Sequence, residues 1–172
     1  MPVSDPVRMR AMARRDAPQS VADLAFHEAG HAVVGCVIGQ QVTRVSIKAR
    51  KDSYGRSEYD QPQRDKWRQP SLREVKRYVV PLLAGLKAQE IRRRGGDSRW
   101  LRQSREWIEA EWTLGFKVKN EANRVLKHLW AATGRLLKRR WTAVEQVAAE
   151  LERVGEVEGS FVRDLIVGGV RE

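Results

Sequence analysis

Apolar side chains recur every three or four residues along most of the chain, which is the spacing of one face of a helix. This pattern covers five segments: 21–38, 72–94, 97–112, 119–154 and 161–167. Residues 42–48 instead combine β-branched side chains with an imperfect alternation, and residues 55–59 repeat that pattern more weakly, so both segments are predicted strands. The chain is therefore expected to be mainly α (α+β), with a small β-hairpin or sheet beside the first helix.

Polar residues at the ends of these segments supply helix caps and turns. Ser20 or Asp23 can cap the first helix, and Ser71 with Glu74 three residues later gives the capping-box pattern for the next one. Pro81 is expected either to kink that helix or to mark its true start, because proline lacks the amide hydrogen that a helix interior needs. Residues 155–160 are expected to form a turn.

A chain of 172 residues is long enough for one well-packed domain. Residues 1–20 contain three prolines, scattered arginines and no sustained periodicity, so they are predicted to form a flexible basic arm before a domain at 21–172. The longest apolar runs, 32–38 and 78–86, are too short to cross a bilayer, and no secretory signal is visible. We therefore expect a soluble, cytoplasmic protein. Because Cys36 is the single cysteine, an intramolecular disulfide and any zinc site built from paired thiolates are excluded. Cys36 is expected to be buried and to pack in the core.

Basic residues outnumber acidic ones by 33 to 22, which gives the chain a formal charge of +11. This excess favours anionic partners such as nucleic acid, for which it predicts weak and salt-sensitive binding. Trp100, Trp107 and Trp112 lie among arginines and are interpreted either as a base-stacking surface or as packing in the core and in an oligomer contact, with packing favoured. The basic runs at 92–94 and 138–140 are expected to be solvated helix ends rather than a phosphate site.

One motif carries recognisable chemistry: the pentapeptide His27-Glu28-Ala29-Gly30-His31, inside the first predicted helix. Residues four apart lie on one face of a helix, so the two imidazoles can hold one Zn²⁺ ion. Glu28 can then act as general base toward a metal-activated water, which is the chemistry of a metalloprotease. The alternative interpretation is an ordinary polar helix face, and the apolar residues around the motif favour the metal site.

The chain resembles the peptidase domain of FtsH-type zinc metalloproteases over residues 21–166. The resemblance begins with the segment His-Glu-Ala-Gly-His-Ala-Val-Val-Gly at 27–35, and continues through 42–50 with Tyr54-Gly55, 79–90 and 156–166, in the family's order. It implies a stand-alone peptidase domain. FtsH-type enzymes also carry an ATPase module, but this chain has no G-x-x-x-x-G-K-[ST] sequence.

The resemblance also implies a third metal ligand, because the family supplies an Asp at the start of a later helix. The nearest counterpart is Asp97, which can alternatively be a simple N-cap after Gly95-Gly96. Glu90 is expected to be an ion-paired structural residue. Glu106 and Glu109 are expected to face solvent, and His128 to be a surface or packing histidine.

These observations predict a zinc-dependent endopeptidase in which His27, His31 and Asp97 bind the metal and Glu28 is the catalytic base. Without an ATPase module, it would act on unfolded or flexible polypeptides or work with a separate ATPase or unfoldase, and assembly into an oligomer is left open. An extended substrate is expected to pair with the strand at 42–49. The alternatives are a basic, nucleic-acid-associated regulator or adaptor built on an inactive peptidase fold, and a repressor-cleaving regulatory peptidase.

Overall fold

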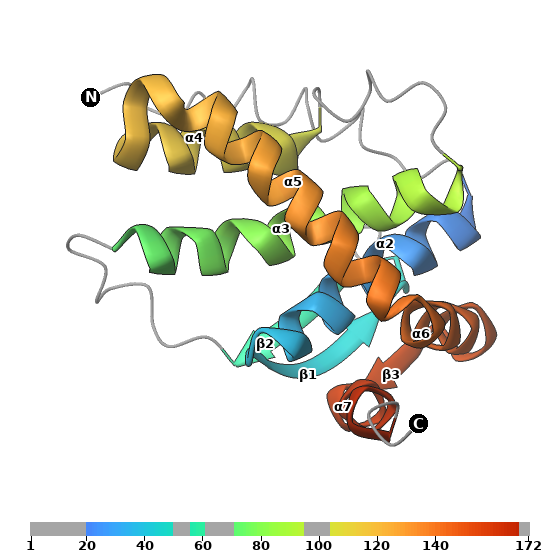
Figure 1. The fold of residues 1–172 in the computed structure, drawn as a ribbon. Coiled ribbons are helices and arrows are strands. Elements are labelled where there is room, and N and C mark those ends of the chain that lie inside the picture. The colour runs from blue at the N-terminus through green and yellow to red at the C-terminus, as the bar shows by residue number, and fades with distance from the viewer. Residues whose placement is uncertain (1–19, 50–55, 61–70, 95–103, 169–172) are drawn as a thin grey trace.

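The computed structural model describes residues 20–49, 56–60, 71–94 and 104–168. Within them the chain forms six α-helices, one short 3-10 helix and a three-stranded antiparallel sheet, which confirms a mainly helical α+β architecture (Figure 1). The elements are α2 (Val21–Val37), β1 (Gln41–Ser46), β2 (Arg56–Asp60), α3 (Leu72–Arg92), α4 (Arg105–Val118), η3 (Lys119–Glu121), α5 (Ala122–Arg139), α6 (Trp141–Val154), β3 (Glu156–Glu158) and α7 (Gly159–Gly168). Almost all of the predicted basic arm at 1–20 lies outside the described residues.

Helices α2 and α3 begin at the predicted caps. The Ser20 hydroxyl accepts a hydrogen bond from the backbone of Asp23 at 3.0 Å and so caps α2. Ser71 and Glu74 form the complete capping box that begins α3. That helix runs through Pro81 without interruption, so Pro81 does not mark its start. The long amphipathic segment at 119–154 is divided at Arg140 into α5 and α6.

The sheet has the order β2-β1-β3, and β1 is its central strand. Val45 in β1 lies opposite Ser57 in β2 and Val157 in β3. The expectation that the strand at 42–49 would offer an open edge to a substrate is therefore wrong, because both of its edges are already paired. The third strand had been expected to be part of a turn. A strand of three residues is too short to show a hydrophobic periodicity in the sequence. Gly155, with φ of 79°, turns the chain back onto β1.

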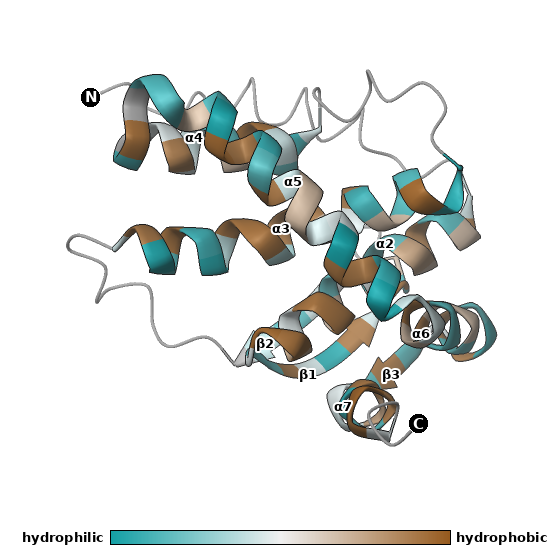
Figure 2. Cartoon of the chain, in the orientation of Figure 1, coloured by the Kyte–Doolittle hydropathy of each residue, from teal (hydrophilic) through white to brown (hydrophobic). Residues whose placement is uncertain are grey.

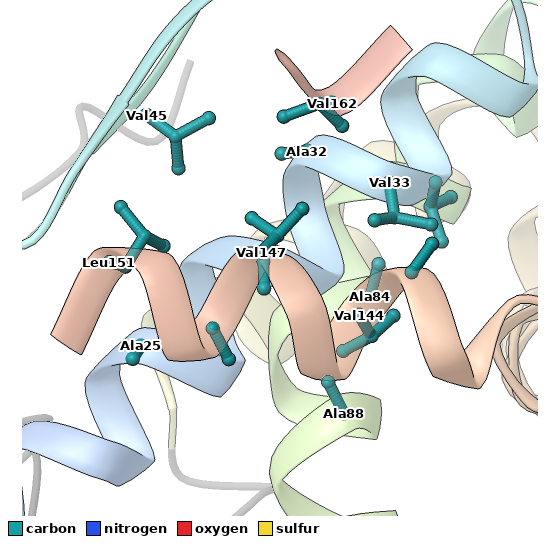
Figure 3. Close-up of a cluster of buried hydrophobic side chains, with 14 of the residues drawn as sticks. Ala25, Ala32, Val33, Val45, Ala84, Ala88, Val144, Val147, Leu151 and Val162 are labelled. Carbon is teal, nitrogen blue, oxygen red and sulfur yellow. The ribbon is translucent and has the colours of Figure 1, made fainter. Parts of the chain in front are cut away.

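The main hydrophobic core surrounds α2, which contacts α3, α6, α7 and β1. Figure 3 shows side chains of these elements meeting around Ala32 and Val33, with Val147 and Leu151 from α6 on one side. Small residues on α2 allow this close packing. A Cβ added to Gly30 would lie 2.7 Å from the carbonyl oxygen of Ala84, so α3 approaches α2 at backbone distance there. Cys36 packs against the edge of this core and is half-buried.

A second core joins α3, α4 and α5. Leu83, Leu114 and Leu126 are almost completely buried in it. Trp107 packs edge-on against Trp130 with ring centroids 5.2 Å apart, which confirms core packing for Trp107. Core packing is wrong for Trp112, which is 61% exposed on the same helix, and Trp100 lies outside the described residues.

The helix expected at 97–112 is observed over 105–118. The Ser104 hydroxyl accepts a hydrogen bond from the backbone of Trp107 at 3.2 Å at its beginning. Residues 97–103 lie outside the described residues, so the expected cap at Asp97 stays a prediction. Among the helices that the structure describes, each is too short or too polar to cross a membrane.

A buried carboxylate joins the start of α2 to the end of α3. Asp23 is 5% exposed, and it accepts hydrogen bonds from Arg92 Nη1 at 2.5 Å and from Arg93 Nη2 at 2.9 Å. The arginines at 92 and 93 are therefore ion-paired rather than simply solvated. Burial alone would raise the pKa of Asp23, but the hydrogen bond and charge of Arg93, aided by Arg92, hold it below its ordinary value.

Asp23→Asn is therefore expected to lower the free energy of unfolding by about 2 kcal/mol at pH 7. A depressed carboxylate pKa stabilises the fold above the unfolded pKa of about 3.9, and that contribution is lost as the pH falls through the lower folded value. The difference in free energy of unfolding between the wild type and Asp23→Asn, measured by urea titration, should accordingly decrease between pH 5 and pH 2.5. Glu150→Gln, which breaks the exposed pair with Arg153, serves as the control with little effect. A difference in free energy of unfolding that stays constant down to pH 2.5 would contradict this account.

Candidate metal centre

Three side chains from two helices converge on one point. His27 and His31 lie one turn apart on α2, and Glu106 reaches them from the first turn of α4. The two Nε2 atoms are 3.0 Å apart, and Glu106 Oε1 is 2.8 Å from that of His27 and 3.4 Å from that of His31. Donor atoms around a tetrahedral zinc ion are about 3.3 Å apart, since each lies about 2.0–2.1 Å from the metal. Two edges of the triangle are about 0.3–0.5 Å shorter than this spacing, so the three side chains could hold a zinc ion after a small separation of their donor atoms.

The backbone of α3 orients one of the rings. His31 Nδ1 lies 2.7 Å from the carbonyl oxygen of Pro81. Because a carbonyl only accepts hydrogen bonds, Nδ1 carries a proton, and Nε2 is the ring nitrogen that faces His27 and Glu106. A backbone carbonyl is a common partner for the second nitrogen of a metal-binding histidine.

A glycine on α3 makes room for the imidazoles. A Cβ added to Gly85 would lie 2.5 Å from His31 Nε2 and 2.7 Å from His27 Nε2. No side chain fits at this position while the rings stay where they are. The sequence contains a signal for this role, since a glycine inside a helix costs about 0.5–1 kcal/mol relative to alanine and so indicates a close approach.

Glu28 lies next to this triangle and is almost fully buried, with 6% of its surface exposed. Its Oε2 accepts a hydrogen bond from the hydroxyl of Ser57 in β2 at 3.0 Å. Glu28 and Ser57 line a cavity of about 330 Å³ together with the three converging side chains, and Tyr59 also contributes to its wall. The structure thus places the candidate base and the candidate ligands around one space.

The charges of the three side chains depend on one another. Burial lowers the pKa of His27, but the adjacent Glu106 carboxylate outweighs this effect and raises the pKa to about 9. Burial likewise raises the pKa of Glu106, and the charge and hydrogen bonds of His27 and His31 nevertheless hold it well below the usual range. Without another cation, a proton on His27 compensates the Glu106 carboxylate. A divalent cation would have to displace that proton, so its binding must strengthen as the pH rises.

The structure brings together His27, Glu28 and His31 as the motif predicts. The carboxylate that it places beside the two imidazoles is Glu106. Asp97 lies outside the described residues, so its role as a ligand stays a prediction. Glu106 was expected to face solvent, and this expectation is wrong. Glu106 is four residues before the buried Ala110 and eight before the buried Leu114, so it lies on the inward face of α4. A carboxylate on an apolar helix stripe was the signal that could have identified it.

The remaining acidic and histidine candidates, Glu90, Glu109 and His128, make contacts away from the three converging side chains. Glu90 forms an ion pair with Lys87, as expected. Glu109 does not simply face solvent, since it accepts a hydrogen bond from the hydroxyl of Tyr78. His128 is exposed, and its Nδ1 lies against a backbone carbonyl of its own helix. These three residues do not belong to the group of converging ligands among the described residues.

Replacing Glu106 tests the ligand set. Glu106→Gln is expected to weaken zinc binding by about 100-fold or more, because the amide lacks the charge that balances the ion. Competition with a chromogenic chelator measures the change, and Glu111→Gln, at an exposed position of the same helix, is the control.

Asp97→Ala belongs in the same experiment. A loss equal to that of Glu106→Gln would identify Asp97 as a ligand, whereas an unchanged affinity would leave it as a helix cap. Wild-type affinity in Glu106→Gln would contradict the candidate ligand set of His27, His31 and Glu106.

No protein-family model matches the chain, and no curated protein matches it either. The resemblance to FtsH-type peptidases accordingly depends on the motifs themselves.

Proposed function

We propose that this protein is a zinc-dependent endopeptidase. The observation that supports it most is the triangle of His27 Nε2, His31 Nε2 and Glu106 Oε1, with edges of 2.8, 3.0 and 3.4 Å. Two imidazoles and a carboxylate are a common ligand set of catalytic zinc sites, which keep a further position for water or substrate. The buried Glu28 beside this triangle supplies the general base that hydrolysis also needs.

Each residue has a distinct task in the proposed reaction. When bound, the zinc ion would polarise the substrate carbonyl and lower the pKa of a water toward about 7. Glu28 accepts a proton from the attacking water on its carboxylate and passes it to the leaving amine nitrogen. Ser57 holds one oxygen of that carboxylate through its 3.0 Å hydrogen bond, which leaves the other oxygen for proton transfer. The Pro81 carbonyl keeps the His31 ring in its ligating orientation.

The surroundings of the cavity favour an extended polypeptide as substrate. Among the described residues, β2 pairs with β1 on one side only, and its residues Ser57 and Tyr59 line the cavity. Such an edge can bind the backbone of an extended segment. The proposed substrates are therefore unfolded or flexible proteins in the cytoplasm, delivered where necessary by a separate ATPase or unfoldase.

Hydrolysis of casein tests this function. The zinc-loaded protein is expected to cleave it, chelation of the metal to stop cleavage, and added Zn²⁺ but not Mg²⁺ to restore it. His27→Ala, which removes one ligand, should be inactive at every zinc concentration that leaves the wild type active. Cleavage that persists after complete removal of the metal would contradict the proposal.

A further inference from the structure

The exposed side of α5 carries positive charge without any acidic residue. Residues 122–139 include five Lys or Arg and no Asp or Glu. All five are exposed: Arg124, Lys127, Arg135, Lys138 and Arg139. Arg124 pairs with Glu121 just before the helix, at 3.0 Å. The apolar residues of the helix face the two cores. Figure 1 shows α5 running across α3 over much of the molecule, and Figure 2 shows its alternating hydrophilic and hydrophobic sides.

This charge is not a general property of the surface. The neighbouring α6 contains three glutamates and a single arginine, and α4 contains three glutamates with one arginine and one lysine. Much of the formal charge of +11 is instead concentrated on α5 and on α3, which α5 crosses. A local excess of one sign on one face is the electrostatic pattern expected of a surface that binds a polyanion.

A hollow of about 330 Å³ lies between these two helices, where Gly134 and Ala131 leave space. Four basic residues and one acidic residue surround it: Lys87, Arg94, Arg135, Lys138 and Glu90. Lys87 and Glu90 pair with each other. For Arg135 and Lys138, no carboxylate of the described segments lies within ion-pair distance. Their charges are therefore available to an external anion.

We infer that α5 and this hollow bind the phosphate backbone of double-stranded nucleic acid without selecting bases. From Arg124 to Lys138 the helix extends about 21 Å, at about 1.5 Å per residue. That length corresponds to about six phosphates along one strand at about 3.4 Å each. Lys and Arg on one helix face can thus contact several phosphates of a duplex, and this binding site is separate from the proposed zinc site.

The residues on this face favour a duplex over two other anionic partners. A helix that binds a membrane surface inserts exposed apolar side chains into it. The exposed large apolar residues among the described segments, Val21, Val37, Trp112, Val154 and Val167, all lie on other elements. Single strands bind through stacking on exposed aromatic rings. The only aromatic ring of α5 other than His128 is Trp130, which is half-buried under the Lys87 ammonium at 4.4 Å.

Fluorescence anisotropy with a labelled 20-base-pair DNA duplex of mixed sequence tests this inference on the full chain. The wild type is expected to bind with log K falling by about 4 per unit of log salt, because the α5 cations would neutralise about four or five of the phosphates within reach, at about −0.9 each. Arg135→Glu with Lys138→Glu should weaken binding at 0.1 M salt by at least about 10-fold and flatten the slope by about 2. Thermal melting checks that both exposed substitutions leave the fold intact.

The matched control is Arg73→Glu with Lys76→Glu, which changes the net charge equally at exposed positions on the first turns of α3. It is expected to weaken binding less than about 3-fold, as an effect of net charge alone. Equal losses in both double variants would overturn the inference, and so would a wild type that fails to bind the duplex at 50 mM salt. Binding to phosphatidylserine vesicles but not to DNA would overturn it in favour of a membrane surface.

Discussion

Glu28→Gln is expected to bind zinc with wild-type affinity and to cleave casein at least about 100-fold more slowly, in line with the usual contribution of a general base. The amide oxygen can still accept the hydrogen bond from Ser57, so the buried side chain keeps its position. It cannot take a proton from water, because the neutral amide lacks both the basicity and the negative charge of the carboxylate. The rate of casein cleavage and the zinc affinity are measured on the same preparation.

Two comparisons make this result specific. Glu111→Gln, an identical substitution at an exposed position, should leave the rate unchanged. Ser57→Ala should reduce the rate less than Glu28→Gln does, because it frees the carboxylate without removing it. A Glu28→Gln protein that retains zinc and full activity would remove Glu28 from the catalytic role.

Gly85→Ala is expected to abolish zinc binding at concentrations that saturate the wild type. The new methyl group would lie 2.5 Å from His31 Nε2 and 2.7 Å from His27 Nε2, inside the contact distance of both ligating atoms. The His31 ring cannot simply rotate away, since that would break its hydrogen bond to Pro81. A shift of α3 away from the rings would also be unfavourable, because it would disrupt the close packing of α3 against Gly30. Overpacking of this kind costs about 1–3 kcal/mol of stability in addition.

Gly115→Ala is the matched control for this substitution. An added Cβ there has no atom of the described residues within 4 Å, so alanine should raise stability by about 0.5–1 kcal/mol through helix propensity. Isothermal titration with zinc and circular dichroism separate loss of the site from loss of the fold. A folded Gly85→Ala protein with wild-type zinc affinity would contradict the proposed position of the metal.

Local sequence signals predicted the helices that carry the site. The Ser20 cap of α2 and the Ser71–Glu74 capping box of α3 are decided by neighbours within one turn, so the sequence alone reveals them. The relation between His27 and His31 is equally local, because both lie on one helix. The order of the strands is different in kind, since the pairing of β1 with β3 joins segments more than 100 residues apart.

The candidate third ligand illustrates the same limit. Spacing along α4 can show that Glu106 shares a face with Ala110 and Leu114, but not that this face meets α2. The resemblance directed attention to Asp97 instead, at the start of the same predicted helix. Which carboxylate approaches the imidazoles depends on how α4 packs across α3, and that arrangement is a property of the tertiary structure.

The two proposed sites can be tested independently because they use different residues. The zinc site uses α2, α4, Gly85 and β2, whereas the cations of the nucleic-acid surface lie on α5 and the last turns of α3. Substitutions at Arg135 and Lys138 should therefore leave zinc binding unchanged. Glu28→Gln should in turn leave DNA affinity unchanged.

The most direct test of the central claim is the metal content of the purified protein, combined with X-ray absorption at the zinc edge. We expect one zinc ion per chain, with a first shell of two imidazole nitrogens and at least one carboxylate oxygen, and its loss in His31→Ala. A protein that is isolated without metal and binds no added zinc near pH 8, or whose zinc survives replacement of both histidines, would contradict the account.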